Sequence, residues 1–335
     1  MTEQEGEFPP HKIDIHVRMS RDRPFRATFT NPDGKHCDNN RNFPMFIHRA
    51  TNACKDQLPT PSEEPRGFRV RFEVLGPLSV LDCANGAGRS LLPSASKKRI
   101  LLASLLSRVN EVVSTESLIA EIWGDQPPAK ARGALHVYMA QLRNGLFENV
   151  GGDRQATIIT DGPGYLLRLE GAGFDQHEFE SLMGRARSLQ DRGQLADAAD
   201  TVRRALDLWR GPALAGLTDG TMLGVFATCL DEEYVAALEL RLEIDLLLGR
   251  HRSVIAELIR LVHDYPLRET FYRQLMLAFY RSERQADALN CFVQLRTRLR
   301  EELGVEPCRP IQQLHQAVLS ADPALDRHMA DVAAS

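Results

Sequence analysis

The segment FRVRFEV at 68–74 alternates apolar and other residues without interruption. A period of two predicts a β-strand with one buried face. The residues that follow, LGPLSVLDCANGAGRSLLP, contain a turn at Gly76-Pro77, a second strand, a glycine-rich turn at 85–88 and a short third strand. A small antiparallel sheet is therefore expected to open this part of the chain.

Two helices are predicted directly after this sheet. The first covers about 96–108, and the second has Ser114 as its N-cap, Glu116 in its first turn and Gly124 at its end. The apolar residues of the second helix that are expected to be buried are Leu118, Ile119, Ile122 and Trp123.

A third helix is predicted over about 129–147. The pair Pro127-Pro128 fixes its start, because proline is tolerated only in a first helical turn. The residues that it is expected to bury are Ala131, Leu135, Tyr138, Leu142 and Leu146. The segment ATIITDGPGYLLRL at 156–169 then reads as two strands around a tight turn. Sheet, three helices and hairpin in this order indicate a winged helix-turn-helix.

The outward face of the third helix is polar and contains no acidic residue, so it would not repel phosphates. Arginine suits guanine or phosphate, glutamine and asparagine suit adenine, and small apolar side chains pack on thymine methyl groups. A glycine lets a helix approach DNA closely. The candidate DNA-binding residues of this face are Lys130, Gly133, Val137, Ala140, Gln141 and Asn144, flanked by Arg132, His136 and Arg143.

Further residues are candidates for contacts with the DNA backbone, which position a protein without reading sequence. Lys97, Lys98 and Arg99 stand at the start of the first helix, and Thr160 and Gly162 lie in the wing. Tyr165 is expected to pack beneath the turn of the wing as a structural residue.

The chain from Asp175 to Leu319 is predicted to be helical throughout, with short polar turns near 193, 249 and 283. Gly249 and Glu283 are 34 residues apart, the period of tetratricopeptide helix pairs. Such pairs stack and leave a concave surface for partners. The predicted fold class is mainly α with a small antiparallel β component: a winged helix-turn-helix followed by an α-helical tetratricopeptide-like repeat domain.

The expected division is a disordered extension and linker over 1–66, a DNA-binding domain over 67–170, an effector domain over 171–322 and a tail over 323–335. Proline recurs in the first 66 residues, and no apolar periodicity is sustained there. No apolar stretch is long enough to span a bilayer and no signal peptide opens the chain, so we expect a cytoplasmic protein, associated with the nucleoid when it binds DNA.

Net charge separates the two domains. Residues 97–146 carry seven Lys and Arg against four acids, whereas residues 174–304 carry seventeen Arg against twenty-one acids. A basic module joined to an acidic one fits a DNA reader attached to a protein-facing domain.

No catalytic, metal or cofactor site is predicted. The six cysteines form no C-x-x-C pair, the histidines do not cluster, and DCANGAGRS lacks the spacing of a phosphate-binding loop. An enzyme is therefore not expected.

The chain resembles the Streptomyces antibiotic regulatory protein family in its short form. The motifs of the first half are VLGPLSV, KKRILLASLL, VVSTESLIAEIWGDQPPAKARGALHVYMAQLRNGL and IITDGPGYLLRL. Those of the second half are LDLWRGPAL and the long run from HDYPLRETFYRQL to CRPIQQLH. The resemblance covers about 68–322 and implies an OmpR-type winged helix followed by a bacterial transcriptional activator domain.

The resemblance also implies a function. It is that of a pathway-specific activator of a secondary-metabolite (antibiotic) gene cluster, which binds direct repeats near a promoter −35 element. The implied partners are promoter DNA, RNA polymerase holoenzyme and a second protomer, with no membrane.

The leader at 1–66 is unusual for this family. Where relatives carry a basic residue in the recognition helix, this chain has Gly133, Ala140 and Gln141, which indicates a shifted target sequence. Because helix chemistry does not give the sign of regulation, a repressor that senses a ligand or protein through its helical repeats is the alternative.

Overall fold

The computed structural model describes residues 70–83, 88–148 and 155–325, together with three short strands nearer the start of the chain. These strands, β1 (Ile15–His16), β2 (Thr28–Thr30) and β3 (His36–Asp38), pair antiparallel in that order. The remainder of the extension predicted over 1–66 and most of the predicted tail lie outside the described residues. Within the described part, no helix is long and apolar enough to cross a membrane.

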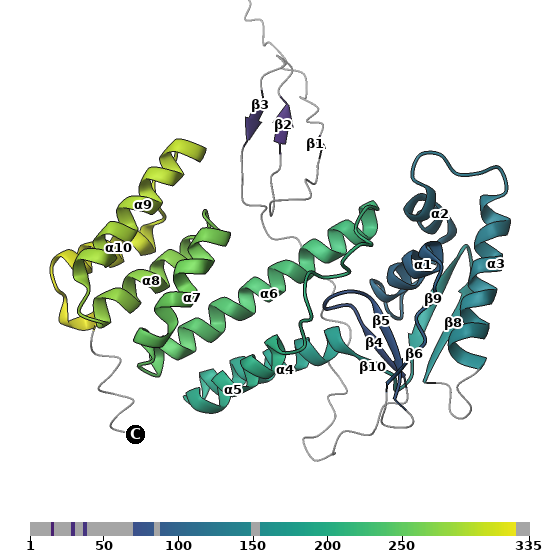
Figure 1. Ribbon diagram of the computed structural model, residues 1–335, viewed down its shortest axis with the longest axis horizontal. Coiled ribbons are helices and arrows are strands. Elements are labelled where there is room, and N and C mark those ends of the chain that lie inside the picture. Colours follow the sequence, from purple (N-terminus) through teal and green to yellow (C-terminus); the bar gives the residue numbers. More distant parts are fainter. Residues whose placement is uncertain are drawn as a thin grey trace, which may run out of the picture. The chain divides into compact units, whose positions relative to one another are not determined.

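Contacts divide the chain into two compact units, one over Thr60–Ile244 and one that contains Asp245–Ser335. Most of the described elements of the first unit are labelled in Figure 1. They are β4 (Val70–Glu73), β5 (Ser79–Asp82), β6 (Arg89–Ser90), α1 (Ser96–Leu106), β7 (Val113–Ser114), α2 (Thr115–Trp123), α3 (Ala131–Arg143), the π-helix Asn144–Glu148, β8 (Ala156–Asp161), β9 (Gly164–Leu169), β10 (Gly173–Phe174), α4 (Asp175–Asp191), α5 (Leu195–Leu206) and most of α6 (Thr221–Leu247). The predicted order of sheet, three helices and hairpin is confirmed.

The first sheet has the order β10-β4-β5-β6. Its β4 buries Val70 and Phe72 and leaves Arg71 and Glu73 half-buried, as the alternation of apolar and polar residues predicts. Strand β10, which the sequence analysis did not predict, pairs parallel with β4. It carries the chain from the wing back to the first sheet and directly into α4.

A second sheet, of order β7-β9-β8, contains the predicted hairpin and a strand that was not predicted. The two residues of β7 pair with the start of β9 at Gly164 and Tyr165. A Cβ atom at Gly164 would lie only 2.2 Å from the carbonyl oxygen of Val113, so only glycine fits here. Two residues are too short a strand to show any periodicity in the sequence.

Helix α3 is shorter than predicted and its buried side is slightly rotated. The α-helix ends at Arg143 and continues as a single π-helical segment. Met139, which was not predicted, is buried, whereas Tyr138 is half-buried and stacks on Trp123 with ring centroids 6.4 Å apart. In α2, only Leu118 of the predicted apolar stripe is fully buried, because Ile119, Ile122 and Trp123 lie at the rim of the packing.

One buried carboxylate joins the first sheet to α4. Asp175 is 1% exposed, and its oxygens accept hydrogen bonds from the backbone N–H groups of Val74 and Leu75 at 2.9 and 3.0 Å. The Arg210 guanidinium lies 3.6 Å from the same carboxylate. Burial raises the pKa of Asp175, and the two amides and Arg210 oppose that rise. The buried carboxylate of Asp175 is therefore both hydrogen-bonded and paired with a positive charge.

A second carboxylate joins the helix-turn-helix to α6. Glu121 of α2 accepts hydrogen bonds from the backbone N–H groups of Met222 and Leu223, both at 2.9 Å. These amides belong to the first turn of α6, which has no intrahelical acceptors for them and carries partial positive charge. A Cβ atom at Gly220 would overlap the Glu121 carboxylate, so glycine makes room for this cap.

Aromatic packing connects α4 and α6. Trp209 lies 5.6 Å from Phe179 of α4 and 4.9 Å from Tyr234 of α6, measured between ring centroids. Glu233 is next to this cluster. The pKa of Glu233 is raised to about 7, first by burial and then by the charge of Glu180, while Arg187 opposes the rise.

The second unit contains α7 (His251–Asp264), α8 (Glu269–Arg281), α9 (Gln285–Leu303), α10 (Arg309–Leu319) and the short 3-10 helix Pro323–Leu325. Gly193, Gly249 and Glu283, one at each predicted turn, all adopt left-handed φ values of 63–75°. The predicted fold class, mainly helical with a small antiparallel sheet component, is confirmed. The closer relation to tetratricopeptide repeats stays a prediction.

Replacing Asp175 with alanine should lower the free energy of unfolding by about 3 kcal/mol, because two buried amides lose their acceptor. Urea unfolding of the full chain measures this loss. Asp200→Ala is the control, since Asp200 is exposed on α5 and forms a surface ion pair with Arg203. Equal losses in the two variants would contradict the role assigned to Asp175.

Glu233→Gln should raise the melting temperature by about 2–4 °C at pH 8 and by less at pH 5. The folded protein binds the Glu233 proton more tightly than the unfolded chain does. Stability from this group is therefore complete below its ordinary pKa and lost as the pH rises through about 7. Solvent screening keeps the effect near 1 kcal/mol or less. The exposed Glu243 on α6 gives a matched control, Glu243→Gln, whose melting temperature should follow that of the wild type at both pH values.

Candidate nucleic-acid interface

The start of α2 is fixed by a cap and by the wing. The Ser114 hydroxyl accepts a hydrogen bond from the backbone N–H of Ser117 at 3.0 Å, so the predicted N-cap is confirmed. The backbone N–H and the hydroxyl of Thr115 both donate to the carbonyl of Pro163, at 3.0 and 2.7 Å. The tip of the hairpin is thus tied to the beginning of the helix that precedes α3.

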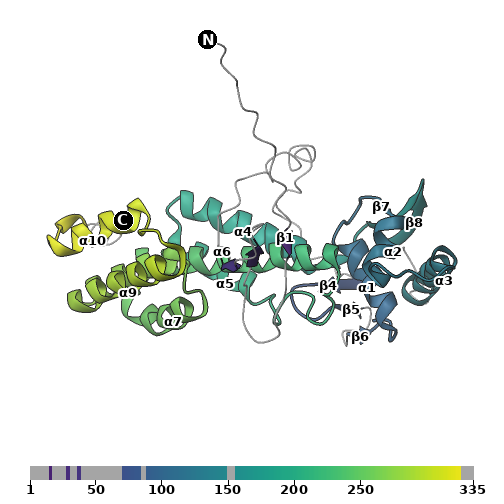
Figure 2. The same ribbon diagram turned by 90° about the horizontal axis from the view of Figure 1, so that it is seen from above.

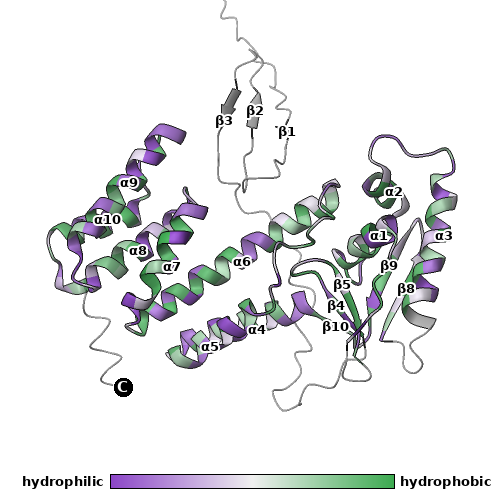
Figure 3. Ribbon diagram, viewed as in Figure 1, coloured by the Kyte–Doolittle hydropathy of each residue, from purple (hydrophilic) through white to green (hydrophobic). Residues whose placement is uncertain are grey.

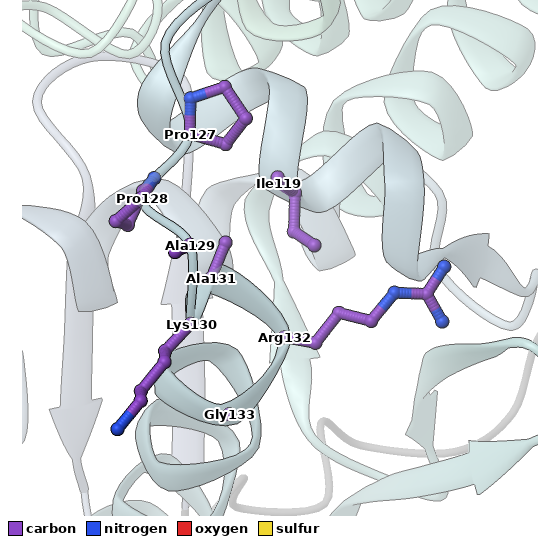
Figure 4. A pocket seen from close by; sticks show the side chains of 8 residues that line it. All are labelled: Ile119, Pro127, Pro128, Ala129, Lys130, Ala131, Arg132 and Gly133. Carbon is purple, nitrogen blue, oxygen red and sulfur yellow. The ribbon is translucent and has the colours of Figure 1, made fainter.

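Helix α3 begins after Lys130, whose backbone is not yet helical and whose side chain makes no capping bond. The carbonyl of Pro128 accepts a hydrogen bond from Ala131, so the proline pair leads into the first turn as predicted. A shallow pocket of 470 Å³ lies at this turn, lined by Ile119 and residues 127–133. Figure 4 shows Lys130 and Arg132 leaving the turn in different directions.

One face of α3 is open. Gly133, Val137 and Gln141 are exposed, and 53% of the Val137 surface is accessible. No atom lies within 4 Å of the position that a Cβ at Gly133 would occupy. Lys130, Ala140 and Asn144 are also exposed. Figure 3 shows the mixed polar and apolar character of this helix. The structure therefore brings six of the predicted residues together on one accessible stripe.

The flanking residues lie on the edge of α3 that faces α2 and the hairpin, and all three contact the protein itself. Arg132 forms an ion pair with Glu116 of α2. The Nδ1 atom of His136 lies 2.5 Å from the hydroxyl oxygen of Tyr165. Arg143 donates to the carbonyl of Ile158 at 2.9 Å and to the hydroxyl of Thr160 at 2.7 Å.

These contacts separate the predicted recognition residues into an open stripe and an anchored edge. Figure 1 and Figure 2 show α3 beside β8, the hairpin strand to which Arg143 bonds. The sequence analysis placed Arg132, His136 and Arg143 on the flank of the helix. It missed their partners because each partner lies at least 15 residues away in the sequence.

The candidate phosphate contacts differ in their surroundings. Lys97 is exposed, with its ammonium 5.0 Å from the centre of the Trp123 ring, and Lys98 is half-buried. Arg99 donates to the carbonyl of Pro93 at 2.7 Å. In the wing, Thr160 is exposed and accepts the bond from Arg143, and Gly162 is exposed with a φ of 51°. Tyr165, which was expected to pack beneath the turn, is buried, with 2% of its surface exposed.

Two protein-family models match the chain. The model described as "Transcriptional regulatory protein, C terminal" matches residues 90–167. The model described as "Bacterial transcriptional activator domain" matches residues 174–319. The first match covers the helix-turn-helix and the wing, and the second covers α4 to α10.

Curated relatives align over both parts. The chain is 37% identical over 270 residues to the regulatory protein DnrI of Streptomyces peucetius, which covers 79% of this chain and 98% of DnrI. It is 38% identical over 267 residues to the regulatory protein AfsR of Streptomyces coelicolor, covering 79% of this chain and 26% of AfsR.

A solved structure has the same fold. It is EmbR of Mycobacterium tuberculosis in complex with a low-affinity phosphopeptide, 32% identical, with a TM-score of 0.71. The similarity covers 79% of this chain and 69% of that one.

Arg143→Ala should lower the free energy of unfolding by about 1–2 kcal/mol without DNA, because two hydrogen bonds between α3 and β8 are lost. Lys130→Ala, at the open start of the same helix, should change it by less than about 0.5 kcal/mol. Thermal unfolding of both variants tests the distinction between the anchored edge and the open stripe. If Arg143→Ala were as stable as Lys130→Ala, the assignment of Arg143 to the anchored edge would be contradicted.

Proposed function

Because the chain belongs to the Streptomyces antibiotic regulatory protein family of transcriptional regulators, we propose that it is a sequence-specific DNA-binding activator of a secondary-metabolite gene cluster. In this proposal α3 enters the major groove and the open stripe reads base edges. The chain binds direct repeats near a promoter −35 element as paired protomers and recruits RNA polymerase holoenzyme.

One observation carries the DNA-binding proposal: the outward stripe of α3 is exposed and free of acidic residues, and it stands beside a hairpin tied to the start of α2. A helix that reads DNA needs one side in the core and the opposite side open to the groove. Leu135, Met139 and Leu142 form the buried side here. The match to a bacterial transcriptional activator domain supports activation over repression.

The open stripe suggests how sequence is read. The Gln141 amide can donate to and accept from an adenine edge, and the exposed Val137 side chain can pack on a thymine methyl group. Gly133 has space around it, so the backbone of α3 can approach the bases closely. Lys130, which extends from the start of the helix, suits a phosphate.

Selection of duplexes from a random-sequence pool by the full chain tests the proposal. The expected result is one enriched motif, present as a direct repeat, with an affinity that falls steeply as salt rises. Footprints on promoters of neighbouring genes, with and without polymerase, should then show protection beside a −35 element. Failure to enrich any motif would overturn the DNA-binding proposal. Enrichment without stimulated transcription in vitro would overturn only the activator role.

Gln141→Ala should weaken binding to the selected duplex by about 1–3 kcal/mol and relax the preference at one base pair. Lys130→Ala is the matched variant on the same stripe. It should weaken binding evenly across sequences and give a shallower salt dependence. Titrations at several salt concentrations separate the two effects. An unchanged base preference in Gln141→Ala would remove Gln141 from the reading face.

A further inference from the structure

The contact between His136 and Tyr165 joins helix α3 to strand β9 of the wing. The hydroxyl oxygen of Tyr165 lies 2.5 Å from Nδ1 of His136, and the two rings meet edge to face with centroids 6.1 Å apart. His136 is exposed, whereas Tyr165 is buried. One ring nitrogen of the histidine is thus held by the protein, while its residue remains on the accessible surface of α3.

Tyr165 is held in place from several directions. Its backbone is the centre of the second sheet, paired with Val113 of β7 on one side and Thr160 of β8 on the other. The Arg143 guanidinium lies 5.8 Å from the centre of its ring. Because the ring is buried and its backbone is paired on both sides, the Tyr165 hydroxyl is held at a fixed position beside α3.

The Tyr165 hydroxyl carries its proton at neutral pH. Burial raises the pKa of this phenol, and the positive charge of Arg143 opposes the rise. A neutral imidazole has one N–H and one bare nitrogen, and the bond made by one nitrogen decides which of them holds the proton. A phenol that donates to Nδ1 leaves the proton of the imidazole on Nε2.

We propose that Tyr165 is a positioning residue that holds His136 in the Nε2–H tautomer, so that α3 presents a hydrogen-bond donor to an acceptor atom of the bound DNA. This inference rests on the DNA-binding function proposed above. Guanine N7 and O6, adenine N7 and thymine O4 are acceptors in the major groove, whereas the cytosine amino group is a donor. A donor fixed at Nε2 would discriminate against that amino group.

The same donor could bond to a phosphate oxygen, which carries no sequence information. The base preferences of the variants distinguish a base edge from a phosphate as the acceptor of this bond. A change of preference at one position identifies a base edge, and an even loss across all sequences identifies a phosphate.

The first test is the tautomer itself. The full chain is labelled with nitrogen-15 in its histidines, and the His136 signals are assigned with His136→Gln. Long-range proton–nitrogen correlation should show a bare Nδ1 and a protonated Nε2, and Tyr165→Phe should shift both nitrogens. A protonated Nδ1 in the neutral ring of the wild-type protein would overturn the proposal.

The second test is a double-mutant cycle on a duplex selected from a random pool by the wild-type chain. Tyr165→Phe should weaken binding about fivefold, the worth of one hydrogen bond. In a His136→Ala background the same change should have an effect of less than about twofold. A full effect of Tyr165→Phe in both backgrounds would overturn the proposal, because Tyr165 would then act independently of His136.

The control is Tyr272→Phe, which removes another buried phenol, bonded to Arg298 in the helical part of the chain. It should leave both the His136 signals and the DNA affinity unchanged.

Melting temperatures report whether Tyr165→Phe is folded. If Tyr165→Phe is not folded, the variants His136→Gln and His136→Leu are compared in its place. The glutamine keeps an N–H donor, so His136→Gln should bind the selected duplex about fivefold more tightly than His136→Leu. Equal affinities would overturn the proposal. A wild-type chain that enriches no motif overturns the proposed function instead, and the tautomer measurement still stands.

Discussion

The carboxylate of Asp175 is the contact on which the arrangement of the first unit depends. It accepts the amides of Val74 and Leu75, at the point where the chain leaves β4, and it begins α4. A buried charge is costly unless it is paired and hydrogen-bonded, and this one has both kinds of partner. The parallel pairing of β10 with β4 holds the same junction through the backbone. The winged helix and the first helices of the activator domain therefore share one packed junction.

Glu121 provides a second joint of the same kind. Its carboxylate caps the first turn of α6, so α2 of the helix-turn-helix is bonded directly to a helix of the activator domain. The wing is tied to α2 through Thr115 and Pro163, and α3 is bonded to α2 through Arg132 and to β8 through Arg143. Movement of α3 relative to α6 would therefore break several of these contacts at once. These contacts support α3 from two sides, which is what the proposed recognition surface requires.

Much of the fold could be predicted from the sequence, because its signals are local. The alternation around Phe72, the cap at Ser114, the prolines before α3 and the glycines of the wing each act within a few residues. The outward stripe of α3 follows from helical geometry in the same way. Strands β7 and β10 could not be predicted, because two residues have no period and their pairing depends on distant partners. Tyr138 was predicted to be buried, but Met139 is buried instead, because the exact rotation of α3 is set by the residues that pack against it.

The sequence by itself determined the fold class and which residues lie on the outward half of α3. It could not determine which of them are bonded to other parts of the protein. That was decided by long-range contacts: Arg132, His136 and Arg143 turn toward Glu116, Tyr165 and the hairpin, while Gly133, Val137 and Gln141 remain open. The physical reason is that helical periodicity fixes the direction of a side chain, whereas its hydrogen-bond partners depend on residues that only the tertiary fold brings near.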